Sequence, residues 1–204
     1  MELVDIKNNA NHRGVPIIRE TSHDILVKEI KKANPQNVLE IGTAVGYSGI
    51  EILKNSNATL VTIEHNSELV SEANKNFKEA GFEKRAKVVC ADCVSELAFM
   101  LASDNYNEKF DFIFLDGPKA QYQNMIDSLI MMLAPGGTIL VDNVLFRGYV
   151  TGEVTPPTKR FKTIIARLKV FIDDFLNRPE LENAKLISVE DGMLVATKKR
   201  KNNN

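Results

Sequence analysis

Short apolar runs and stretches of helical periodicity alternate along most of this chain. The apolar runs have the length and continuity of buried parallel strands, and they lie at residues 38–41, 60–64, 87–90, 111–115 and 138–141. Helices are predicted around and between them, at about residues 21–32, 47–54, 67–80, 94–101, 121–133 and 159–176. Two more strands, at 184–189 and 193–197, flank Glu190, Asp191 and Gly192 and predict a C-terminal hairpin.

This order of elements predicts an α/β fold. Strand–helix units followed by a hairpin indicate a doubly wound, mostly parallel, seven-stranded Rossmann-like sheet with an antiparallel C-terminal hairpin. The 204 residues, 44% of them hydrophobic and 26% charged, suit a single domain over residues 1–204. Residues 1–35 are expected to form an N-terminal cap, with an irregular segment before the helix. Its 11–20 part would fold over the site or, alternatively, form a frayed arm. Residues 198–204 read as a polar, disordered tail.

Composition limits which partners and which cellular compartment we expect. No apolar run is long enough to span a bilayer and no leader follows Met1, so we expect a cytoplasmic protein with no membrane partner. The net charge of −1 does not indicate a nucleic-acid binder, although a local basic patch would be enough to bind nucleic acid. Cys90 and Cys93 could form a redox or zinc pair, but we favour two small residues at the end of a strand, because one pair is half of a four-cysteine site.

The stretch at residues 37–49, NVLEIGTAVGYSG, links a strand to a helix through a glycine turn. Gly42 and Gly46 allow the sharp bend and the close approach of a ligand to the backbone. Ser48 lies in the first turn of the helix, where unpaired N–H groups favour polar ligand atoms. Glu64 follows at about the 20-residue spacing that places a carboxylate on ribose hydroxyls. Ala44 replaces the middle glycine of a dinucleotide loop, so an ordinary strand–turn–helix is the alternative for this motif alone.

An acid or amide stands at the end of each of the five predicted parallel strands. These residues are expected on one rim of the sheet, because ligands of open α/β sheets bind beyond the carboxyl ends of the strands. They are Glu40, Glu64, Asp92, Asp116 and the pair Asp142–Asn143. Clustered acids repel one another unless something positive lies among them. Asp116, Asp142 and Asn143 offer three oxygen ligands, which suit magnesium, manganese or calcium better than zinc.

The amino-acid sequences of three segments resemble those of a known family. EIGTAVGYS resembles motif I of the class I S-adenosylmethionine-dependent methyltransferases. Residues 112–122, FIFLDGPKAQY, and 141–150, VDNVLFRGYV, resemble the metal-binding segments of the metal-dependent O-methyltransferases, which include the catechol and caffeoyl-coenzyme A enzymes. The resemblance implies the strand order 3-2-1-4-5-7-6 with strand 7 antiparallel, S-adenosylmethionine and Mg²⁺ or another hard divalent cation as cofactors, and a homodimer.

The resemblance also assigns roles to residues. Metal ligands would be Asp116, Asp142 and Asn143. Lys119 would act as or assist the general base, with Asp116 beside it in the catalytic set; Gly117-Pro118, where relatives more often have two alanines, stiffens the turn before that lysine. The implied cofactor-binding residues are Ile18, Glu40, Gly42, Ser48, Glu64, Asp92, Cys93 and Asp116.

Within the family the chain is most similar to the bacterial tRNA 5-hydroxyuridine methyltransferases, through the VPII segment, DNVLFRG and Lys159-Arg160. This implies methylation of the 5-hydroxyl of 5-hydroxyuridine at the tRNA wobble position, giving 5-methoxyuridine. The vicinal 4-carbonyl and 5-hydroxyl could chelate one Mg²⁺ as a catechol does, and an anticodon-loop base can be splayed into a pocket. The candidate phosphate contacts are Arg13, Arg19, Arg147, Lys159 and Arg160, of which Arg147 is favoured.

Two other functions are open. A small catechol-like phenol could be the acceptor in the same reaction. A non-enzymatic nucleotide-binding scaffold is the third reading and the weakest, because a scaffold has no need of two acids, an amide and a lysine together at these strand ends.

Overall fold

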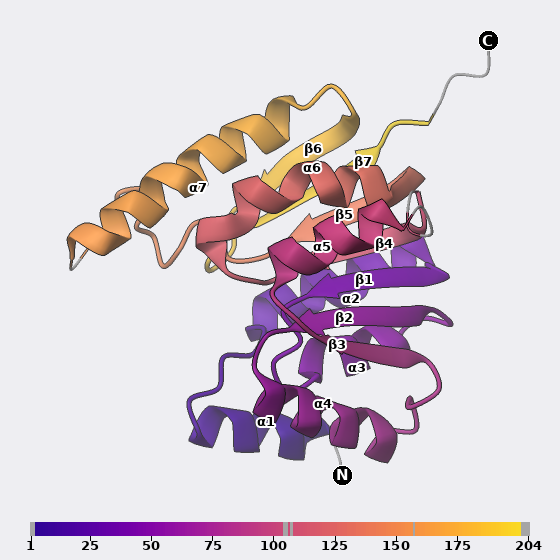
Figure 1. Cartoon of the computed structure of the whole chain (residues 1–204). Helices are drawn as coiled ribbons and strands as arrows, with labels where there is room; N and C mark the ends of the chain where they lie inside the picture. The colour runs from indigo at the N-terminus through magenta and orange to yellow at the C-terminus, as the bar shows by residue number, and fades with distance from the viewer. Residues whose placement is uncertain (1–2, 104–105, 107, 157, 201–204) are drawn as a thin grey trace.

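The computed structural model of the chain describes residues 3–103, 106, 108–156 and 158–200. It contains one seven-stranded sheet with helices on both faces (Figure 1). The strand order is β3-β2-β1-β4-β5-β7-β6. Neighbouring strands pair in parallel from β3 to β5, and β7 is antiparallel to both β5 and β6. The expected fold class, strand order and antiparallel hairpin are thus confirmed.

The strands lie close to their predicted positions. Their bounds are β1 Asn37–Ile41, β2 Thr59–Glu64, β3 Ala86–Cys90, β4 Phe110–Leu115, β5 Leu133–Val141, β6 Leu181–Ile187 and β7 Met193–Lys198. β5 begins five residues earlier than the predicted start at 138, because Pro135, Gly136 and Gly137 end the preceding helix and continue as strand. The pairing of β5 with β4 shifts in register at that point, between Phe110 and Phe112.

Seven α-helices cover this sheet in the described part of the chain. Their bounds are α1 Leu3–His12, α2 Glu20–Ala33, α3 Tyr47–Lys54, α4 Ser67–Glu79, α5 Cys93–Ala102, α6 Tyr122–Met132 and α7 Lys159–Asn177, and a 3₁₀ turn, η1, spans Lys119–Gln121. Helices α5 and α6 lie in front of the sheet and α2 and α3 behind it (Figure 1). One core joins the sheet to α5, α6 and α7, and the other joins it to α1 to α4.

The two cores explain why the strands read as continuous apolar runs. Alternate residues of β4 serve opposite faces: Phe112 and Phe114 pack in the core behind the sheet, while Ile113 and Leu115 pack in the core in front. A strand buried on both faces has no polar side, which is typical of parallel sheets covered by helices. This double burial fixes the strand register, and with it the positions of the residues that follow each strand.

The N-terminal prediction was wrong in part. Residues before 20 were expected to be irregular, but α1 is a helix that buries Ile6 and Ala10 against α3 and its neighbours. Those two apolar residues, with Leu3, share one helical face, and the polar residues between them hide the periodicity in so short a segment. The predicted tail also begins later than expected, because Lys198 belongs to β7, and residues 201–204 lie outside the described part of the chain.

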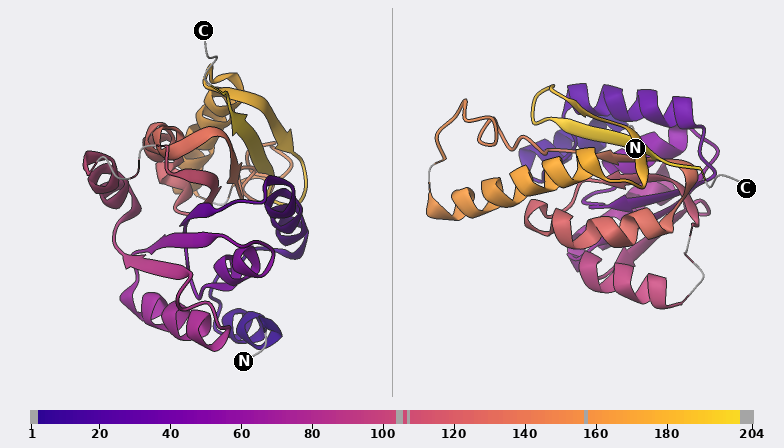
Figure 2. Two further views of the ribbon diagram at one scale, coloured as in Figure 1. Left: turned by 90° about the vertical axis from the view of Figure 1, so that its right-hand side faces the viewer. Right: turned by 90° about the horizontal axis from the view of Figure 1, so that it is seen from above.

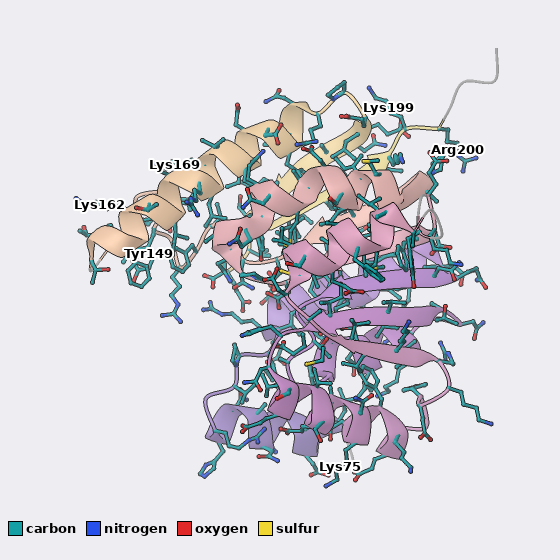
Figure 3. The ribbon with its side chains drawn as sticks, viewed as in Figure 1. Lys75, Tyr149, Lys162, Lys169, Lys199 and Arg200 are labelled. Atoms are coloured by element: carbon teal, nitrogen blue, oxygen red, sulfur yellow. The ribbon has the colours of Figure 1, made fainter. Side chains whose placement is uncertain are left out.

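Helix α7 and the loop before it project beyond the sheet (Figure 2). Tyr149 and Lys162 lie at this outer end of α7, far from Lys75 on α4 (Figure 3). No helix among the described residues is long and apolar enough to cross a bilayer.

Candidate active site

A cavity of about 610 Å³ opens at the carboxyl ends of the parallel strands. Its wall combines the turns after β1, β2, β3, β4 and β5 with the segment before α2 and with the hairpin between β6 and β7. The predicted site residues in this wall are Gly42, Glu64, Asp92, Cys93, Asp116, Lys119, Asn143, Arg19 and Arg147. The structure therefore brings together one glycine turn, several acids and three cations from distant parts of the sequence.

The glycine turn after β1 is the tightest part of the wall. Gly42 has a φ of +100°, and a Cβ there would lie 2.1 Å from the backbone oxygen of Asp116. Asp116 in turn donates its N–H to the carbonyl oxygen of Ile41 at 2.9 Å. The chain leaving β1 therefore lies against the chain leaving β4, with no room for a side chain between them. Gly46, with a φ of +84°, directly precedes α3.

Two acids, one at the end of β2 and one just after β3, line the cavity in fixed orientations. Glu64 is buried, and its two carboxylate oxygens accept hydrogen bonds from the N–H groups of Ala44 at 3.1 Å and Asn66 at 3.0 Å. Asp92 caps α5 and accepts hydrogen bonds from the N–H and the hydroxyl of Ser95, both at 3.0 Å. These bonds hold the pKa of Asp92 below its usual range. Both carboxylates are thus set to accept hydrogen bonds from a polar ligand.

Three predicted cofactor residues are not in the cavity wall. Glu40 is fully buried, and its carboxylate accepts hydrogen bonds from Ser48 Oγ at 2.5 Å and Thr62 Oγ1 at 2.6 Å. Burial raises the pKa of Glu40 to about 7, against the lowering effect of those two hydroxyls. Ser48 therefore pairs with Glu40 beneath the glycine turn. Ile18 is buried too, and its neighbour Ile17 faces the cavity instead.

The three candidate metal ligands form one connected group. Asn143 Nδ2 donates to Asp116 Oδ1 at 3.2 Å, and the Asn143 backbone N–H donates to Asp142 Oδ1 at 2.7 Å. Asn143 adopts a left-handed conformation with a φ of +62°, which the tight turn after β5 imposes on it. Asp142 is 1% exposed, and Ser22 Oγ also donates to its Oδ1, at 3.1 Å. The other oxygen, Oδ2, is buried with no hydrogen-bond partner.

The electrostatics of this group favour a cation. Burial raises the pKa of Asp116, and burial followed by the charge of Asp116 raises the pKa of Asp142 to about 7. An unpartnered buried carboxylate oxygen is costly, and a hard cation would satisfy it. The described residues contain no cluster of three or more His, Cys, Asp or Glu side chains placed to hold a metal. The third protein ligand here would accordingly be the amide of Asn143, whose oxygen and nitrogen exchange places by rotation.

Lys119 begins the turn η1 and lines the same cavity. Its charge acts on both carboxyls and works to lower the pKa of Asp116 and of Asp142. Tyr122, one turn further, donates its hydroxyl to the backbone oxygen of Asp142 at 3.1 Å. The lysine predicted for proton transfer therefore lies within electrostatic reach of the predicted metal ligands.

Sequence reasoning missed Asp191 as a site residue. This acid lies in the turn between β6 and β7, where the sequence offered only a turn signal. In the structure its buried side chain lines the cavity, forms an ion pair with Arg19 Nη2 at 3.0 Å and accepts the N–H of Arg147 at 2.7 Å. Asp191 thus joins the segment before α2 to the loop after β5, a contact that no local pattern could reveal.

The basic candidates differ in their positions. Arg147 and Arg19 line the cavity, and the Arg147 side chain is exposed. Arg13 lies outside the lining, and both oxygens of Glu72 accept hydrogen bonds from it at 2.7 and 2.8 Å. Lys159 and Arg160 form the first turn of α7, but their side chains lie outside the described part of the structure.

Comparison with known proteins places this chain in a family. The O-methyltransferase family model matches residues 3–199, nearly the whole chain. This chain belongs to the O-methyltransferase family. Among its relatives, the caffeoyl-CoA O-methyltransferase of Stellaria longipes is 31% identical over 125 residues, which are 59% of this chain and 51% of that protein. The catechol O-methyltransferase of Niastella koreensis is 29% identical over 155 residues, 74% of this chain and 69% of that one.

Solved structures of O-methyltransferases share the fold. The O-methyltransferase from Bacillus cereus, in complex with SAH, superposes with a TM-score of 0.81 and 23% identity, covering 97% of this chain and 90% of that one. The seven-stranded sheet with an antiparallel C-terminal hairpin described above is therefore an established architecture for O-methyltransferases.

Proposed function

We propose that this protein transfers a methyl group from S-adenosylmethionine to a hydroxyl of an acceptor with two vicinal oxygens, in a reaction that depends on a divalent cation. The observation that carries the proposal is the unpartnered, buried Oδ2 of Asp142. Asp142 itself lies behind the cavity wall, and the two other proposed ligands, Asp116 and Asn143, line the cavity together with the glycine turn. The family membership supports the methyl transfer, and the SAH bound to the Bacillus cereus relative supports the donor.

The donor would occupy the part of the cavity between the turns after β1, β2 and β3. The bare backbone at Gly42 allows a ligand to approach closely, and Glu64 would accept hydrogen bonds from ribose hydroxyls. Asp92 and Cys93 lie next along the wall, where the adenine-bearing end would fit. The apolar Ile17 and Leu69 offer surface for the less polar parts of the donor.

The acceptor would lie between the metal ligands and Lys119. Asp116, Asp142 and Asn143 would hold a hard divalent cation, whose charge lowers the pKa of an acceptor hydroxyl. Lys119 lines the cavity beside them and would receive or relay the hydroxyl proton when its amine is neutral. Fixing the acceptor oxygen opposite the methyl group supplies the positional part of the rate enhancement.

For the acceptor itself we propose 5-hydroxyuridine at the wobble position of tRNA. The support is the resemblance in the VPII and DNVLFRG segments and the placement of two arginines, Arg19 and Arg147, in the cavity wall. Arg147 is exposed and no side-chain hydrogen bond or ion pair of it is found among the described residues, so its guanidinium is available to a phosphate. The tRNA would approach from the side of Arg147. We also propose that the protein forms a homodimer.

A small catechol-like phenol is the second candidate acceptor, and the similarity to a catechol O-methyltransferase favours it. One assay separates the two. Tritiated S-adenosylmethionine and Mg²⁺ are incubated with the protein and either tRNA from cells that lack it or a catechol, at matched concentrations. Mg²⁺-dependent label in tRNA, at a higher kcat/KM than label in catechol, supports the first acceptor. Label in catechol alone supports the second, and label in neither contradicts both.

A further inference from the structure

The first turn of α2 binds two acids at the carboxyl edge of the sheet. Thr21 Oγ1 donates to Glu190 Oε1 at 3.0 Å, and Ser22 Oγ donates to Asp142 Oδ1 at 3.1 Å. The two contacts differ in their surroundings, because the first is exposed and the second is buried. The amino end of a helix also carries a partial positive charge, which favours acids at this place.

The contact between Ser22 and Asp142 joins residues 120 positions apart in the sequence. Ser22 is 1% exposed and Asp142 is equally buried, so water does not compete for this hydrogen bond. The backbone N–H of Asn143 donates to the same oxygen, Oδ1, at 2.7 Å. Two donors on Oδ1 and none on Oδ2 fix the rotation of the carboxylate and determine which oxygen is left free.

We propose that Ser22 is a positioning residue for Asp142. Its hydroxyl holds Oδ1 and thereby leaves Oδ2 to bind a divalent cation. The inference rests on the proposed function, because it takes Asp142 as a metal ligand. Groups that orient a ligand commonly change metal affinity about 10- to 100-fold when they are removed, since a freely rotating carboxylate must be ordered again on binding. Ser22 itself touches neither substrate nor cation.

A residue whose hydrogen bond only holds α2 against the end of β5 would behave differently. Losing such a structural hydrogen bond lowers stability but leaves the carboxylate of Asp142 with the same affinity for a cation. The neighbouring Thr21 is a matched control for that case. It lies in the same helical turn and donates to a different acid, the exposed Glu190, which is not one of the proposed metal ligands.

The test measures Mn²⁺ binding to the purified full-length protein, because the free ion is counted directly by its electron paramagnetic resonance signal. For Ser22→Ala we expect Mn²⁺ affinity to fall about 10- to 100-fold. Thr21→Ala should bind Mn²⁺ as the wild type does. Ser22→Cys carries a thiol, which is a weaker donor of similar size, so its Mn²⁺ affinity should lie between those of the two alanine variants. S-adenosylmethionine affinity and the thermal midpoint of each variant report whether the fold is retained.

The outcomes separate this inference from the proposed function. Unchanged Mn²⁺ affinity in Ser22→Ala overturns the positioning role while leaving the metal site intact. If the wild type itself binds no Mn²⁺, both the metal dependence and the role of Ser22 are rejected. Metal binding that weakens as expected, in a protein that methylates neither tRNA nor catechol, supports the inference and contradicts only the proposed acceptors.

Discussion

Gly42 lies so close to Asp116 that a methyl group on its Cα would come within 2.1 Å of the backbone oxygen of that acid. The contact joins the turn that we assign to the methyl donor to the strand end that we assign to the metal. Asp116 is thus fixed by its backbone contacts with β1 as well as by its side-chain bond to Asn143. The two halves of the site therefore share one wall.

The first prediction concerns this contact. Gly42→Ala introduces a steric overlap and places a residue with a side chain at an unfavourable φ. We therefore expect it to lower the free energy of unfolding by at least about 3 kcal/mol. Gly81→Ala is the matched control, because Gly81 also has a positive φ, of +81°, but nothing within 4 Å of its added Cβ. That change should cost about 1 kcal/mol. Urea unfolding of both variants provides the comparison. Equal losses in the free energy of unfolding would show that small backbone shifts remove the overlap at Gly42.

The second prediction concerns Glu40 and pH. The pKa of this carboxyl rises from 4.5 to about 7 on folding, so between these values the folded protein binds more protons than the unfolded chain. Stability from Glu40 is therefore present in full below pH 4.5 and declines as pH rises, by up to about 3 kcal/mol above pH 7. Glu40→Gln removes the titration and keeps the shape.

Urea unfolding at several pH values checks this expectation. The free energy of unfolding of Glu40→Gln minus that of the wild type should grow between pH 5 and pH 8. Other titrating groups affect both proteins alike and cancel in the difference. A difference that stays constant over this range would mean that Glu40 ionises in the folded state as it does in the unfolded chain.

The third prediction concerns Arg147. Replacing it with alanine should weaken tRNA binding across sequences and reduce the slope of log affinity against log salt by about 1, because one phosphate contact is lost. The rate with a small catechol should change less. Arg13→Ala serves as the control, since Arg13 is bound to Glu72 outside the cavity wall. If both variants weaken tRNA binding equally, Arg147 has no special place in recognition.

The fourth prediction concerns Asp142. Asp142→Ala should abolish turnover and leave S-adenosylmethionine affinity nearly intact, because the side chain would position the acceptor rather than the donor. Calorimetric titration with the donor and a methyl-transfer assay on the same preparation give the two quantities. Equal loss of donor binding and turnover would argue against a metal-ligand role.

Most of the fold could be predicted because it depends on local patterns. Buried strands are continuous apolar runs, and the helix at Tyr47–Lys54 begins and ends where its sequence predicts. Helix α1 escaped prediction because two of its few apolar residues, Ile6 and Ala10, are separated by polar ones and become a buried face only when they meet α3.

The site was predictable where it follows from strand ends and not where it depends on tertiary contacts. Asp116 and Asn143 meet because the carboxyl ends of neighbouring parallel strands share one edge. Asp191 reaches the cavity by the folding back of a hairpin, which a turn signal does not encode. Glu40 was expected on the rim, but its side chain lies beneath the turn, where Ser48 and Thr62 bind it.

The most direct test of the metal-dependent reaction is the initial rate of methyl transfer from S-adenosylmethionine after treatment with a chelator, and again after Mg²⁺ is restored. The arrangement of Asp116, Asp142 and Asn143 predicts that transfer to tRNA or catechol stops on chelation and recovers with Mg²⁺, while the donor stays bound throughout. Transfer that continues at the same rate in excess chelator would contradict it.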